Sequence, residues 1–156
     1  IPQKDLIGTW NYYSTACLFE TENLLKKAGG VVVATQVEKQ FNEYCDKAGI
    51  KEGTTKFVFN TDSTYNARIG KVKLSGNYTI DPVTKQLKLS YMKGLGQINA
   101  MPMLSSKNLK IMFDADGFLK MMKTLSMFTK DNSIEILAAM ADMYDGMLLG
   151  FDMKKE

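Results

Sequence analysis

The sequence predicts a mostly β, single-domain protein spanning residues 1–156: an up-and-down antiparallel barrel of about eight strands, with helices inserted after the first strand and before the last. Two observations predict this class. Extended runs with alternating apolar and polar residues fill most of the chain, separated by turn sequences. Helical spacing replaces alternation only at about 22–48 and 117–145. Open antiparallel sheets of this size tend to close, because closure removes their unpaired edges.

The first strand is the β-rich run from Trp10 to Phe19. Side chains of a regular strand alternate between its two faces. Alternation therefore predicts one shared face for Trp10, Tyr12, Ser14, Ala16 and Leu18.

Two helices are expected in the first insertion. Thr21 is placed to cap a short helix, which Gly29-Gly30 ends. From Val33, apolar residues recur at helical spacing as far as Ala48, and Gly49 fits the C-cap.

The middle of the chain carries the clearest strand pattern. From Lys71 to Ile80 every second residue faces a core, and the turn at 81–85 leads into a partner strand at 87–91. The segments 57–59 and 65–67 form a hairpin by the same logic. Shorter strands are expected at 97–103 and 109–113, where Pro102 lacks a ladder donor and suits an edge or a bulge.

The second insertion begins after Asp116-Gly117, where an apolar stripe runs from Phe118 to Phe128. A further helix starts near Asn132, because Glu135 three residues later completes a signal like a capping box. Gly146 ends this helix, and residues 147–153 alternate as the last strand.

Composition and charge exclude several function classes. The net charge of +3 is carried almost wholly by lysines that alternate with apolar strand residues, which indicates a solvated face and no nucleic-acid partner. No stretch approaches the roughly 20 apolar residues of a membrane helix. The chain has no histidine, so Ser-His-Asp, Cys-His and His-bearing zinc sites are excluded. We expect no catalytic residues, no cofactor and no metal site.

One acidic motif directly precedes the second insertion. Asp114-Ala115-Asp116-Gly117 resembles the opening of a calcium-binding loop, but the twelfth position is Leu125, where such a loop needs a bidentate carboxylate. We interpret the motif as a turn that caps the following helix.

Several motifs together carry a resemblance to a known family. They are Leu6-Ile7-Gly8-Thr9-Trp10, Phe19-Glu20 with Asn23-Leu24-Leu25, Ala28-Gly29-Gly30, and Phe57-x-Phe59 with Asp62-x-Thr64-Tyr65. Along nearly its whole length the chain resembles a family of uncharacterised, exported bacterial lipocalin-like domains. The resemblance implies a calycin-type barrel, distant from lipocalins proper, and no established activity. In lipocalins proper the tryptophan packs at the closed barrel end under an arginine from near the last strand, where this chain offers Lys154 and Lys155.

The start of the chain and its cysteines bear on its compartment. The chain begins at Ile1-Pro2, which suggests that an upstream targeting segment has been removed; we expect an exported protein, periplasmic or anchored to the outer membrane through that segment. Cys17 and Cys45 are compatible with one disulfide in such a compartment. Two buried free thiols are the alternative.

Two functional hypotheses follow from the barrel. The first is a carrier for a small hydrophobic or amphipathic ligand, such as a fatty acid or an aromatic metabolite, held in the lumen. The lumen candidates are Trp10, Tyr12, Phe57, Phe59, Tyr65, Tyr78, Tyr91, Ile111, Phe113 and Phe151.

The second is a structural or interaction module whose lumen is filled by these rings. It would bind a partner protein or a second copy through its Met-rich helices. Flexible thioether side chains suit adaptable surfaces as well as cores. The methionines concerned are Met121, Met122, Met127, Met140, Met143, Met147 and Met153.

Overall fold

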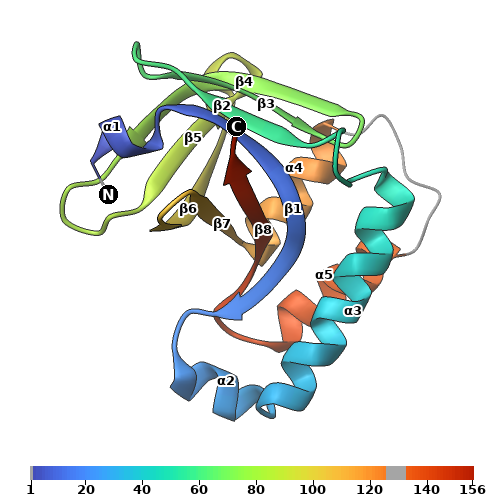
Figure 1. Cartoon of the computed structure of the whole chain (residues 1–156). Coiled ribbons are helices and arrows are strands. Elements are labelled where there is room, and N and C mark those ends of the chain that lie inside the picture. The colour runs from blue at the N-terminus through green and yellow to red at the C-terminus, as the bar shows by residue number, and fades with distance from the viewer. Residues whose placement is uncertain (1, 126–132) are drawn as a thin grey trace.

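Eight antiparallel strands form a closed barrel, in which each strand pairs with the next and β8 returns to β1 (Figure 1). The computed structural model describes residues 2–125 and 133–156. The strands are β1 Gly8–Phe19, β2 Lys56–Phe59, β3 Thr64–Ile69, β4 Val72–Ile80, β5 Leu87–Tyr91, β6 Gly96–Ser105, β7 Asn108–Asp114 and β8 Met147–Lys155. The predicted fold class is confirmed.

The helices occupy the two predicted insertions, with short additions elsewhere. They are α1 Gln3–Leu6, α2 Glu22–Ala28, α3 Val31–Ala48, the 3-10 turn η1 Met92–Gly94, α4 Ala115–Leu125 and α5 Ser133–Met143. Thr21 Oγ1 accepts a hydrogen bond from the Leu24 amide at 3.1 Å, and Gly49 ends α3 in the left-handed conformation, as predicted. Phe128 and Asn132 lie outside the described residues.

The helices gather on one side of the barrel, and α1 lies away from them. Figure 1 shows α3 and α5 side by side beyond β1, with α2 leading into α3. Within the described ranges, no helix combines the length and the apolar character needed to cross a membrane.

The face assignment along β1 is wrong beyond Tyr12. Tyr12 pairs with Met153 and Ser14 with Asp152, so Tyr13 is an extra residue that forms a β-bulge. A bulge moves every later side chain to the opposite face. Trp10 and Tyr12 pack in or against the main core as predicted, but beyond the bulge Cys17 and Phe19 do so. Ala16 and Leu18 instead belong to a second apolar cluster with Met112 and Leu148.

Pro102 lies in a part of β6 that pairs with only one neighbouring strand. The pairing of β5 with β6 ends at Leu87 opposite Ala100, so Pro102 lies beyond it and faces Ile111 of β7 alone. The missing amide donor is therefore tolerated, as the prediction of an edge position required.

Candidate functional site

The closed end of the barrel is organised around Trp10, which is 1% exposed. Its Nε1–H donates to the Leu6 carbonyl of α1 at 2.8 Å, and the Lys155 ammonium lies 5.5 Å from the ring centroid. Gly8 leaves room for this lysine, since a Cβ there would lie 3.1 Å from Lys155 Cε and the glycine adopts a φ of 132°. Lys155 is thus the cation that the last strand places beside the tryptophan ring.

The predicted lumen residues do face inward. All ten belong to the main core or pack against it, and only Tyr12 is half-buried. Their rings contact one another: Phe59 lies 5.1 Å from Tyr78 and 6.1 Å from Phe57, centroid to centroid. Phe57 in turn lies 6.2 Å from Phe113. These are the separations of packed aromatic pairs.

The helices complete this packing from the other end. Phe118 of α4 lies 5.4 Å from Phe113 and 5.8 Å from Phe151, and Phe41 of α3 lies 5.8 Å from Phe118. All four rings are fully buried. A continuous column of rings therefore runs from strands β2 and β7 to helices α3 and α4.

Two tyrosine hydroxyls of the lumen donate hydrogen bonds to the backbone. Tyr65 donates to the Ser90 carbonyl at 2.7 Å, and Tyr78 donates to the Asn60 carbonyl at 2.8 Å. Burial raises the pKa of both phenols. These two hydrogen bonds therefore link strand β3 to β5 and strand β4 to the loop after β2.

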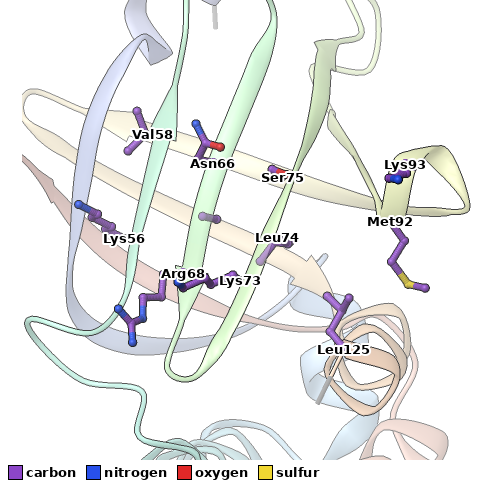
Figure 2. Close-up of a pocket in the computed structure, with 11 residues that line it drawn as sticks. Lys56, Val58, Asn66, Arg68, Lys73, Leu74, Ser75, Met92, Lys93 and Leu125 are labelled. Atoms are coloured by element: carbon purple, nitrogen blue, oxygen red, sulfur yellow. The ribbon is translucent and has the colours of Figure 1, made fainter. Parts of the chain in front are cut away.

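A cavity of about 600 Å³ lies on the outer wall of the barrel, across β2, β3 and β4 (Figure 2). We call it the outer-wall groove. Its lining residues are Lys56, Val58, Asn66, Ala67, Arg68, Lys73, Leu74, Ser75, Met92, Lys93 and Leu125. The strand register places its polar side chains in rows. Lys56, Arg68 and Lys73 lie directly opposite one another across the three strands, and Val58, Asn66 and Ser75 form the next row.

One border of the groove is a strained turn. Met92 and Lys93 of η1 have φ values of 51° and 55°, so two successive non-glycine residues adopt the left-handed conformation. This conformation is unfavourable for residues with a Cβ. Such strain is typical of positions whose side chains must be held in a particular place. Both residues line the groove.

The sequence interpretation missed the outer-wall groove, because it treated the strand lysines as a solvated face. The signal was present in the hairpin between β3 and β4. Ile69 pairs with Val72 around a two-residue turn, which puts Arg68 directly opposite Lys73. Only the position of Lys56 needs the pairing of a third strand, β2.

The acidic motif caps α4, as interpreted from sequence. Asp114 Oδ2 accepts a hydrogen bond from the Gly117 amide at 3.0 Å. Partial burial, with the nearby carboxylates of Asp114 and Asp142, raises the pKa of Asp116. Across the described parts of the chain, no group of three or more acidic or cysteine side chains could hold a metal ion.

Both cysteines are free thiols in the structure, and the Cys17–Cys45 disulfide stays a prediction. Cys17 on β1 is half-buried and Cys45 on α3 is buried. Burial, with a smaller contribution from Glu38, raises the pKa of Cys17 to about 12. Burial also raises the pKa of Cys45.

The Met-rich region is divided between core and surface. Met121, Met122, Met147 and Met153 are buried in the main core, and Met140 packs against it. Met143 is 71% exposed, and Met127 lies outside the described residues. Self-association or a protein partner on these helices stays a prediction.

The up-and-down barrel, with its Gly8-x-Trp10 start packed at one end, places the chain in the lipocalin-like class. In particular, it belongs to the family described as Lipocalin-like domain (DUF4923), whose model matches residues 1–155. A crystal structure of a DUF4847 family protein from Bacteroides vulgatus is similar at 10% sequence identity. The match covers 96% of this chain and 92% of that chain, with a TM-score of 0.41. A search of curated proteins finds no match.

Proposed function

We propose that this lipocalin-like domain binds a small amphipathic molecule in the outer-wall groove, and that the side-chain-filled barrel is its rigid scaffold. The observation that carries the proposal is the groove itself, with its volume of about 600 Å³. Small-molecule sites occupy about 300 to 1,000 Å³ and combine apolar walls with a few polar groups. The groove has both, since Val58, Leu74 and Leu125 line it together with Asn66 and Ser75.

The packing of the lumen supports this placement of the ligand. A guest in the lumen would have to displace rings such as Phe113 and Phe118, which lie 5.4 Å apart and are fully buried. Removing a large aromatic side chain from a core costs about 3 to 5 kcal/mol. The groove requires no such rearrangement, because it is open in the structure and most of its polar side chains are exposed.

Methyl NMR tests the location of the ligand. Dodecanoate and 1-dodecanol are titrated separately into the protein, below their aggregation concentrations. We expect saturable shifts of the Val58 and Leu125 methyl signals with at least one of them, and unchanged Ile111 and Met153 signals. Ile111 and Met153 serve as lumen reporters because both are fully buried in the main core.

Two variants that add the same ring, one inside the groove and one outside it, test whether the groove binds the ligand. Val58→Trp fills the groove and should abolish the shifts, whereas Asn99→Trp adds the same ring at an exposed site of β6 outside the groove. Shifts centred on Ile111 and Met153 would place the ligand in the lumen and overturn the groove proposal. Absence of saturable shifts with both amphiphiles would remove the proposed small-molecule function.

A further inference from the structure

The outer-wall groove concentrates positive charge. Lys56, Arg68, Lys73 and Lys93 line it, and among the described residues no carboxylate does. Arg68 is the only arginine of the chain. On a protein whose net charge is only +3, four cations around one cavity are a local excess.

Three of these cations lie directly opposite one another on paired strands. Lys56 faces Arg68 across β2 and β3, and Arg68 faces Lys73 across β3 and β4. Side chains directly opposite each other on one face of a sheet are neighbours, and like charges there are destabilising. An anion placed over the row would be attracted by all three cations and would offset their mutual repulsion.

The Arg68 guanidinium is held in place by a hydrogen bond to the backbone. Its Nε–H donates to the Gly70 carbonyl at 3.1 Å, which holds the guanidinium at the turn between β3 and β4. A guanidinium presents its donors in a planar fork that matches carboxylate and phosphate oxygens. Lys73, on the next strand, adds a mobile point charge beside that fork.

The apolar part of the groove lies to one side of the row. Figure 2 shows Lys56, Arg68 and Lys73 together, with Leu125 and Met92 at the opposite border and Leu74 between. The Met92-Lys93 turn keeps its left-handed conformation at that border. Three cations at one end, and apolar side chains with Lys93 at the other, match a molecule with a charged head and a hydrocarbon or ring body.

Building on the proposed function, we infer that the ligand of the outer-wall groove is an anionic amphiphile. Its carboxylate or phosphate head group lies on the row formed by Lys56, Arg68 and Lys73. Its apolar body lies against Met92 and Leu125.

Comparison of matched amphiphiles tests this inference. Dodecanoate, dodecyl phosphate and 1-dodecanol share one chain and differ in head group, and acetate supplies a carboxylate without the chain. We expect both anionic amphiphiles to bind about tenfold more tightly than the alcohol, and acetate to bind measurably more weakly than dodecanoate. Raising sodium chloride from 50 to 500 mM should weaken dodecanoate binding, because the exposed row is screened.

Two charge reversals provide the matched variants. Lys73→Glu should weaken dodecanoate binding about tenfold and leave 1-dodecanol unaffected. Lys88→Glu changes the net charge equally at an exposed position of β5 outside the groove and should leave the binding of both amphiphiles unchanged. Circular dichroism checks the fold of both variants, and the salt titration of the unmodified protein decides the question if Lys73→Glu does not fold.

The outcomes separate the two proposals. Equal affinity for dodecanoate and 1-dodecanol, without salt dependence, would overturn the anionic head group while the groove remained a binding site. Equal affinity for acetate and dodecanoate would overturn the apolar part of the ligand. Failure of every amphiphile to bind would remove the proposed function and this inference with it.

Discussion

Lys155 of the last strand lies directly opposite Trp10 of the first, and its ammonium group stands 5.5 Å from the indole centroid. The two residues join β1 to β8 at the closed end of the barrel. The ring itself is fully enclosed and hydrogen-bonded to Leu6, whereas Lys155 is exposed. Burial of the ring and the cation contact therefore contribute very different amounts of free energy.

Substitution of each residue should reveal this difference. Trp10→Ala should lower the free energy of unfolding by about 3 to 5 kcal/mol, as expected for a large buried aromatic side chain. Lys155→Ala should lower it by only about 0.5 to 1 kcal/mol, the value of an exposed cation–π contact. Urea denaturation followed by circular dichroism measures both. A small loss for Trp10→Ala would contradict the enclosed position of the ring.

Gly150 should tolerate no side chain. A Cβ at this position of β8 would lie 1.9 Å from the Ile111 carbonyl oxygen of β7, and backbone cannot move aside as a flexible side chain can. We expect Gly150→Ala to destabilise the protein by more than about 2 kcal/mol or to prevent folding. Gly117→Ala, in helix α4, is the matched control. A Cβ at Gly117 would lie 3.4 Å or more from the nearest side-chain atoms, those of Asp114 and Ile98, which is an ordinary van der Waals distance. We expect Gly117→Ala to raise the free energy of unfolding, measured by heat or urea, by up to about 1 kcal/mol, because alanine favours the helical conformation.

The two thiols should react slowly in the folded protein. Because burial raises the pKa of Cys17 to about 12, the thiol of the native state is almost wholly protonated at pH 8, and only the thiolate reacts with disulfide reagents. The rate for Cys17 should keep rising with pH above the usual thiol range and level off only near pH 12. Unfolding in guanidinium without reductant should expose two reactive thiols per chain. Finding none would show that Cys17 and Cys45 are bridged.

The fold was predictable because most strands follow strict alternation. The run from Val72 to Ile80 places its apolar residues at every second position, and the structure buries Val72, Leu74 and Tyr78 as expected. The prediction of which residues of the first strand share a face was wrong for a local reason. The bulge at Tyr13 adds one residue opposite β8, and no residue type in that run marks where two residues will face one.

The outer-wall groove was harder to predict, because a site on a sheet surface depends on which strands become neighbours. Lys56, Arg68 and Lys73 are separated in sequence and meet only through the pairing of β2, β3 and β4. The alternation showed correctly that such residues face away from the core. It could not show that Leu125, from a helix that follows β7, would close one border of a cavity there.

The strained turn bordering the groove offers a test in which stability and binding should change in opposite directions. Lys93 has a φ of 55°, a conformation that glycine adopts without the steric cost of a Cβ. Lys93→Gly should therefore keep or raise the free energy of unfolding, by up to about 1 kcal/mol. The same change removes a cation from the groove and should weaken dodecanoate binding. Ser106→Gly relieves the same conformation, at a φ of 54°, in the turn between β6 and β7 outside the groove, and should alter stability alone. Urea unfolding and the methyl NMR titration, applied to both variants, measure the two effects. Unchanged binding in Lys93→Gly would show that the Lys93 ammonium does not contribute to ligand binding.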